Sequence, residues 1–138
     1  MSWDVMVFKF AGTPPSIEEF DESNLQPMGA HASIRERISQ HLPGVDWSDP
    51  TWGNYERDGL SFEFNMGEDD PITNFMVHVR GTGDAIAALM RFAVPSGWTV
   101  LDCSTGEFLD PANPSDAGWT GFQAFRDRVI GASEGDDG

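Results

Sequence analysis

Hydrophobic and polar residues alternate across residues 60–81 in a way that predicts two strands joined by an acidic turn. Apolar side chains occupy every second position from Leu60 to Met66 and again from Phe75 to Val79. This period of two is typical of a strand that buries one face. Between them, the segment Gly67 to Pro71 combines a glycine and a proline with three acids, which disfavour pairing and burial. The pattern predicts an antiparallel hairpin with an acidic tip.

The same reasoning places further strands before and after this hairpin. The first expected strand is apolar on both faces, which favours a central position in the sheet. The dipeptide Asp58-Gly59 is a favoured two-residue hairpin turn, so the strand before it should form a meander with the hairpin. The expected additional strands are Trp3 to Phe10, Thr51 to Arg57 and Trp98 to Cys103, with a short return strand at Glu107 to Leu109.

A period near 3.6 residues predicts three helices. Apolar residues recur every four positions from Gly29 to Leu42, where Pro43 and Gly44 provide a stop. Asp84 is placed to cap a second helix that extends to Ala93. A third helix is expected from Trp119 to Ile130, with Trp119, Phe122, Phe125, Arg126 and Val129 spaced for one face.

Strand and helix patterns intermingle without the strict alternation of a doubly wound sheet, so the predicted class is α+β. We expect an antiparallel or mixed sheet of four to six strands with helices mainly on one face. A ferredoxin-like core with an added strand and a terminal helix is one topology that fits. Residues 1–131 should form a single domain, and residues 132–138 should form a disordered acidic tail.

Acidic residues outnumber basic ones by 23 to 8 in the 138-residue chain, which gives a formal net charge of −15. Nucleic acid and anionic membrane are therefore poor partners. No window approaches the roughly 20 apolar residues of a membrane span, and the first residues lack the features of a secretory signal. We therefore expect a cytoplasmic protein.

Candidate sites for catalysis, metals or cofactors are few in this sequence. The turn from Gly81 to Asp84 lacks the third glycine of a dinucleotide site and the lysine of a P-loop, and the acidic tip lacks the ligand spacing of an EF-hand. The three histidines are well separated, and His78 is expected on the outer face of its strand. Cys103 is expected to be a buried, inert thiol. We predict no catalytic residue, no metal, no cofactor and no enzymatic activity.

Aromatic residues next to acidic loops point instead to protein binding. Trp47 and Trp52 alternate with Asp46 and Asp49, which is the composition of an interface hot spot that faces a basic partner. We add the acids of the hairpin tip to this candidate surface. The predicted partner-binding residues are Asp46, Trp47, Asp49, Trp52, Glu68, Asp69 and Asp70.

Three stretches carry a resemblance to known proteins: Val45 to Gly53, Asn65 to Pro71 and Leu101 to Leu109. With these stretches, and in its size, charge and α+β pattern, the chain resembles small acidic bacterial domains of unassigned function and the immunity proteins of bacterial toxin systems. The resemblance implies a basic toxin as the partner. Toxins that cut nucleic acid must be basic, and an acidic inhibitor gains fast association and some mimicry of phosphate.

The alternative function belongs to another class. In this hypothesis the chain is a small enzyme, or a ligand- or cation-binding domain, that uses loop carboxylates with His78 or Cys103. A concave pocket that gathers these side chains would favour this alternative.

Overall fold

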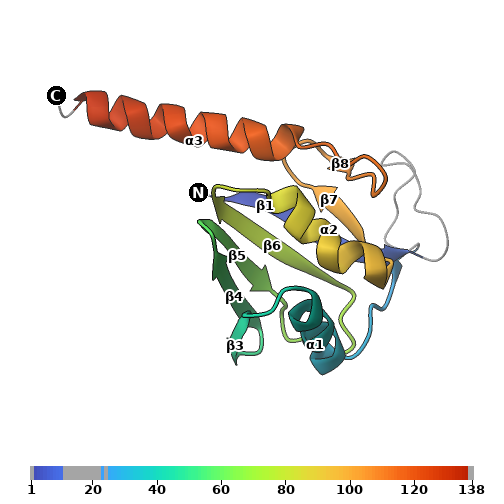
Figure 1. Ribbon diagram of the computed structural model, residues 1–138. Helices are drawn as coiled ribbons and strands as arrows, with labels where there is room; N and C mark the ends of the chain where they lie inside the picture. The colour runs from blue at the N-terminus through green and yellow to red at the C-terminus, as the bar shows by residue number, and fades with distance from the viewer. Residues whose placement is uncertain (1, 11–22, 24, 137–138) are drawn as a thin grey trace.

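The computed structural model describes residues 2–10, 23 and 25–136, and it contains one antiparallel sheet and three helices (Figure 1). The strands are β1 (Trp3–Phe10), β2 (Leu25–Gln26), β3 (Asp46–Asp49), β4 (Trp52–Arg57), β5 (Leu60–Asn65), β6 (Asn74–Gly81), β7 (Thr99–Asp102) and β8 (Glu107–Phe108). The helices are α1 (His31–His41), α2 (Ala85–Ser96) and α3 (Ala117–Asp136). The α+β class is confirmed.

The strands are ordered β3-β4-β5-β6-β1-β7-β8, and β2 pairs with the end of β1. Within this sheet, β1, α1, β5, β6, α2 and β7 follow one another with β3 and β4 inserted after α1. The neighbours β7-β1-β6-β5 are all antiparallel, which is the connectivity and strand order of a ferredoxin-like core. The expected number of four to six strands is wrong, because eight are present in the described part of the chain. The strands that the sequence did not predict, β2 and β3, are too short to show a period of two.

The predicted meander of β4, β5 and β6 is confirmed. Asp58 and Gly59 both have positive φ, 54° and 80°, as a two-residue hairpin turn with the right twist requires. Gly81 lies opposite Leu60, and a Cβ there would come within 2.0 Å of the Gly59 carbonyl oxygen. This turn is therefore fixed by local sequence on both sides.

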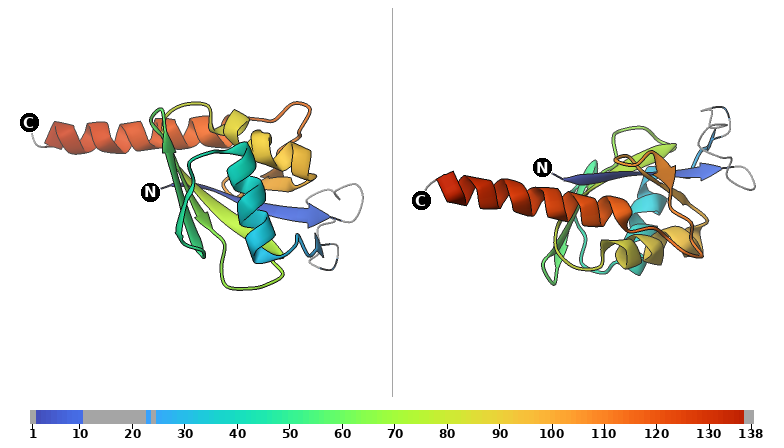
Figure 2. Two further views of the ribbon diagram at one scale, coloured as in Figure 1. Left: turned by 60° about the horizontal axis from the view of Figure 1, so that its bottom comes forward. Right: turned by 90° about the horizontal axis from the view of Figure 1, so that it is seen from above.

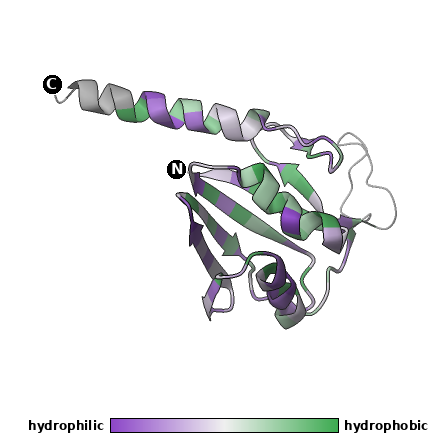
Figure 3. Cartoon of the chain, viewed as in Figure 1, coloured by the Kyte–Doolittle hydropathy of each residue, from purple (hydrophilic) through white to green (hydrophobic). Residues whose placement is uncertain are grey.

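The core lies between the sheet and the two central helices, which cover the same face of the sheet (Figures 1 and 2). Phe64 and Val77 are fully buried there, as the alternation of β5 and β6 predicts, and so is Phe92 of α2. The Phe64 ring lies 5.9 Å from Phe92, and Phe75 meets Trp98 edge to face at 5.7 Å. Helix α2 is largely hydrophobic and α1 largely hydrophilic (Figure 3), so α2 contributes more of this core.

The opposite face of the sheet carries polar and half-buried side chains, and we call it the open face. It is formed by the second set of alternating positions, among them Asp4, Met6, Trp52, Glu63, Met76, His78 and Arg80. Near β8 this face becomes apolar, because the Phe10 ring packs 5.6 Å from Phe108. The open face is therefore the broad surface that the sheet leaves to solvent or to a partner.

Helix α3 is fixed at its beginning and projects from the body at its end (Figures 1 and 2). Trp119 is buried against Trp3, with ring centroids 5.6 Å apart, and its Nε1 donates to the Gly83 carbonyl at 3.0 Å. Phe125 and Val129 share its predicted apolar face but remain 49% and 43% exposed. The helix continues past Ile130 to Asp136. The domain boundary at residue 131 and the disorder beyond it stay predictions.

Candidate functional site

Two acidic loops lie side by side at one end of the sheet. Asp49 is the last residue of β3, at the β3–β4 turn, and the β5–β6 loop contains Glu68, Asp69 and Asp70. The backbone N–H of Met66 donates to the Thr51 carbonyl at 2.9 Å, which joins the two loops, and both appear at the lower end of the sheet in Figure 1. We call these four acids the acidic end. All four are exposed.

The aspartates of β3 are ordered by their own backbone. Asp46 Oδ1 accepts from the backbone N–H of Ser48 at 2.8 Å, and Asp49 Oδ1 accepts from that of Thr51 at 2.9 Å. The hydroxyl groups of Ser48 and Thr51 donate to the same oxygens. The hydroxyl and backbone hydrogen bonds hold the pKa of Asp46 and of Asp49 below its usual value. Both carboxylates therefore stay ionised, and their hydrogen bonds fix the direction in which they point.

Asp70 has a second role that the sequence did not reveal. Its Oδ1 accepts from the backbone N–H of His31, at the start of α1, at 3.1 Å. The His31 ring donates from Nε2 to the Gly67 carbonyl at 2.9 Å, so the acidic loop is attached to the helix at two points. A carboxylate at this position also favours the positive end of the helix dipole. Asp70 is thus partly structural, whereas Glu68 and Asp69 point into solvent.

The two candidate tryptophans lie on opposite faces of the sheet. Trp47 faces the core, where its ring lies 5.8 Å from Phe64 and its Nε1 donates to the Ser39 hydroxyl at 2.7 Å. A Cβ at Gly53 would lie 2.4 Å from this ring, so the glycine makes room for it. Trp47 therefore attaches β3 to α1. Of the two tryptophans, Trp52 is the one that reaches the open face beside the acidic end.

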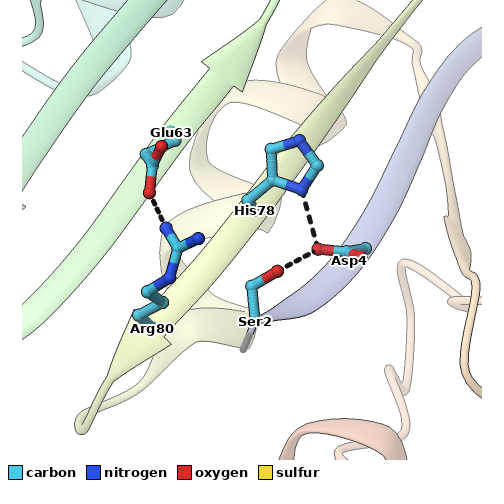
Figure 4. A network of polar contacts seen from close by, with 5 residues as sticks. All are labelled: Ser2, Asp4, Glu63, His78 and Arg80. Atoms are coloured by element: carbon cyan, nitrogen blue, oxygen red, sulfur yellow. Dashed lines mark hydrogen bonds and ion pairs between the residues drawn. The ribbon is translucent and has the colours of Figure 1, made fainter.

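Trp52 is half-buried. Next to it on the open face lies a polar network formed by Ser2, Asp4, Glu63, His78 and Arg80 (Figure 4). The Trp52 ring stacks on His78, with centroids 5.6 Å apart and an interplanar angle of 23°. His78 Nδ1 donates to Asp4 Oδ1 at 2.7 Å, and the Ser2 hydroxyl donates to the same oxygen. Beside this pair, Arg80 forms an ion pair with Glu63.

Asp4 remains ionised within this network. Desolvation alone would raise its pKa, but the hydrogen bonds from Ser2 and His78 and the positive charge of Arg80 together lower it below the usual value. Acid groups with cationic neighbours are common in ordinary surface networks as well as in active sites. His78 and Asp4 therefore act as a general base and its orienting group only if a reacting group lies nearby.

Cys103, expected to be buried, is exposed, because β7 ends one residue earlier at Asp102. Partial desolvation, followed by the charges of Asp4 and Asp102, raises the pKa of its thiol. A raised pKa lowers the thiolate fraction, which is the opposite of what a nucleophilic cysteine needs. Within the described residues, no group of three His, Cys, Asp or Glu side chains is placed to hold a metal ion.

A pocket of about 480 Å³ lies next to Asp4, and sequence reasoning missed it. Its walls come from the start of β1, the turn after β7 and the first half of α3, with Cys103, Phe122 and Phe125 among the lining residues. These segments are far apart in the chain, so no local pattern brings them together. One signal for the pocket was present in the sequence. Phe122 and Phe125 lie one turn apart on α3, and the apolar face of this helix extends beyond the part that packs on the core.

No helix in the described part of the chain is long and apolar enough to cross a membrane. Comparison with protein-family models, curated proteins and solved structures finds no match to this chain.

Proposed function

We propose that this protein is a non-enzymatic binding domain whose partner is a basic protein. The observation that carries the proposal is the convergence of exposed carboxylates at the acidic end, next to Trp52 on the open face. Within the described residues, Asp49, Glu68 and Asp69 form no ion pair. By contrast, the ion pairs formed by arginine join residues elsewhere: Arg57 with Asp58, Arg80 with Glu63 and Arg126 with Asp127.

Unpaired surface charge of one sign acts mainly on association. Charges at the acidic end attract a basic protein over distances up to the Debye length of about 8–10 Å at physiological salt. Exposed carboxylates lose little hydration when the partner first arrives, so they raise the association rate more than the final affinity. The −15 net charge gives the whole molecule the same preference.

Trp52 supplies the apolar contact that electrostatics alone does not. Half-buried tryptophans are rigid and amphipathic, and desolvated ones dominate binding energies at about 2 kcal/mol or more each. Its stack on His78 fixes the ring before the partner arrives, which reduces the entropic cost of binding. We expect Trp52 to govern the dissociation rate.

The finer proposal is an immunity-type inhibitor of a basic toxin. It is supported by the resemblance noted above and by the requirement that toxins acting on nucleic acid carry positive charge. In this role, ordered carboxylates such as Asp46 and Asp49 would occupy phosphate positions on the toxin. This finer proposal would be tested by adding the purified protein to a basic nuclease toxin and measuring whether cleavage of nucleic acid is blocked.

The experiment for the main proposal is affinity capture from the source organism with two matched variants. The first variant, Asp49→Asn/Glu68→Gln/Asp69→Asn, neutralises the acidic end. The control, Glu107→Gln/Asp110→Asn/Asp116→Asn, removes the same three charges from exposed positions near the opposite edge of the sheet. The two variants also remove the same kind of contact with the backbone. Asp110 accepts from the Ala112 N–H at 2.9 Å, as Asp49 accepts from the Thr51 N–H.

We expect basic proteins to be retained by the natural chain and by the control but lost from the acidic-end variant. Equal loss from both variants would mean that bulk charge, and not this surface, retains them. Equal retention by both would remove the acidic end from the interface.

A second candidate function is a small enzyme that uses His78 as a base oriented by Asp4. The 2.7 Å contact between His78 Nδ1 and Asp4 Oδ1 favours it. The Cys103 thiol has a raised pKa, so it is not activated as a nucleophile. Turnover of any small substrate that is lost in His78→Ala and kept in His41→Ala would support this candidate.

A further inference from the structure

The pocket beside Asp4 is open to solvent, and its walls are held in place by contacts between distant parts of the fold. Trp3 forms part of its wall, is almost completely buried, and donates from Nε1 to Asp102 Oδ1 at 3.0 Å. Asp102 also accepts from the backbone N–H and hydroxyl of Ser104, which fixes the turn on the other side. Helix α3 approaches so closely that Gly118 lies against this carboxylate. The three walls are thus tied to one another before any ligand arrives.

The volume of about 480 Å³ suits a small group and not a folded segment. Pockets of about 300–1,000 Å³ are the usual size for small-molecule sites. Helix α3 lines the pocket with Gly121, which contributes no side chain, and with Phe125, which is half exposed. A short side chain or a small ligand can therefore enter without displacing the helix.

The charge of the pocket selects a cation. Asp4 is the ionised residue among its lining groups, and no lysine or arginine lines it within the described residues. Within the described residues, the Asp4 side chain accepts hydrogen bonds from Ser2 and His78, and both end on Oδ1. Its Oδ2 is left available for a donor. An anion would be repelled by this carboxylate, and a neutral apolar ligand would have to desolvate it without compensation.

The aromatic wall extends this preference to an organic cation. Phe122 and Phe125 both line the pocket. The Phe122 ring is already engaged, because it stacks on Trp119 with centroids 5.8 Å apart and the Arg126 guanidinium lies 5.7 Å over it. Aromatic faces attract ammonium groups and also pack against their methylene chains. The second phenylalanine, Phe125, is 49% exposed and offers the surface for such a chain.

We propose that this pocket binds an alkylammonium group, with the charged nitrogen at Asp4 Oδ2 and the methylene chain along Phe125. The ammonium group comes either from a free amine or from a lysine side chain of another protein. The pocket shares no lining residue with the acidic end, so the proposal stands or falls independently of the partner interface.

The test is a titration of the ¹⁵N-labelled protein, followed by amide chemical shifts, with three probes. n-Pentylamine carries the ammonium group and n-pentanol is its neutral counterpart. The third probe, the peptide acetyl-Gly-Lys-Gly-amide, presents the same group on a backbone. We expect n-pentylamine to shift the amides of Asp4, Thr105 and Gly121 and to bind at least tenfold more tightly than n-pentanol.

Two variants decide whether the pocket is responsible. Asp4→Asn keeps acceptors for Ser2 and His78 but removes the charge, and Phe125→Ala changes a half-exposed side chain whose loss does not threaten folding. We expect each to weaken n-pentylamine by about tenfold, while Asp110→Asn, an exposed control, leaves binding unchanged. Tighter binding of the lysine peptide than of n-pentylamine would identify a protein lysine as the source, and the reverse would identify a free amine.

The proposal is overturned if n-pentanol binds as tightly as n-pentylamine, if the shifts lie outside the pocket, or if Asp110→Asn weakens binding as much as Asp4→Asn. Absence of binding by both n-pentylamine and the lysine peptide also overturns it.

Discussion

Replacing Gly118 by alanine should destabilise this protein, whereas the same change at Gly121, one turn along α3, should stabilise it. At Gly121 an added Cβ meets no atom within 4 Å. Alanine there raises the helix propensity of an exposed position, which contributes about 0.5–1 kcal/mol. At Gly118 the added Cβ would lie 1.8 Å from Asp102 Oδ2 and 2.7 Å from its Cγ. Either the carboxylate or the helix must move.

The cost follows from what the movement breaks. Asp102 is 1% exposed, and its Oδ1 accepts from Trp3 Nε1 and from Ser104. Each hydrogen bond to a buried charged acceptor contributes about 1.5–3 kcal/mol, and overpacking a core costs about 1–3 kcal/mol. If α3 moves away instead, the ring contact between Trp3 and Trp119 is lost. Such an aromatic contact stabilises the fold by about 0.5–1.5 kcal/mol in addition to the burial of the two rings. We expect Gly118→Ala to lose about 2–4 kcal/mol in the free energy of unfolding.

Urea unfolding followed by tryptophan fluorescence measures both variants under identical conditions. With a slope of about 2 kcal/mol per molar urea, the loss in Gly118→Ala and the gain in Gly121→Ala together should separate the two midpoints by roughly 1.3–2.5 M. Gly118→Ala with a midpoint equal to or above that of Gly121→Ala would refute the close approach of α3 to Asp102.

Three further predictions concern the core, the charge network and the interface. Phe64→Ala should cost about 3–5 kcal/mol because the side chain is fully buried, whereas Glu68→Ala should stay within about 0.5 kcal/mol; equal losses in denaturant melts would contradict this. The lowered pKa of Asp4 stabilises the fold above the pKa that the carboxyl has in the unfolded chain, and this contribution is lost as pH falls through the folded pKa. The stability difference between the natural chain and Asp4→Asn should therefore shrink below about pH 4, and an unchanged difference in melts across that range would be inconsistent. Trp52→Ala should raise the dissociation rate of a captured partner at least tenfold with little change in its association rate, as surface-immobilised binding would record.

The sequence predicts the fold well where the information is local. Alternation from Leu60 to Met66 and the Asp58-Gly59 turn specify the meander because each acts over a few residues. Asp84 was also identifiable as a helix cap, and its carboxylate accepts from Ala87 N–H at 2.9 Å. Features of this kind depend on backbone conformation and periodicity, which a single sequence displays directly.

The site could be predicted only in part, because its contacts join distant segments. The bond from His31 N–H to Asp70 spans 39 positions, so the acidic loop could not be recognised as a helix cap. The separation of Trp47 from Trp52 depends on an irregularity in the pairing of β3 with β4 between Asp46 and Asp49. Such an irregularity changes which face a side chain reaches, and a short edge strand carries too few residues to reveal it.

The association rate with a captured basic partner, measured across a salt series from about 50 to 500 mM, tests the central claim most directly. The natural chain and the control Glu107→Gln/Asp110→Asn/Asp116→Asn should associate fast at low salt and lose that speed as salt rises. For Asp49→Asn/Glu68→Gln/Asp69→Asn, association at low salt should be about tenfold slower and clearly less dependent on salt, with an unchanged dissociation rate. Association of the natural chain that is indifferent to salt, or equal salt dependence in the two triple variants, would contradict the account.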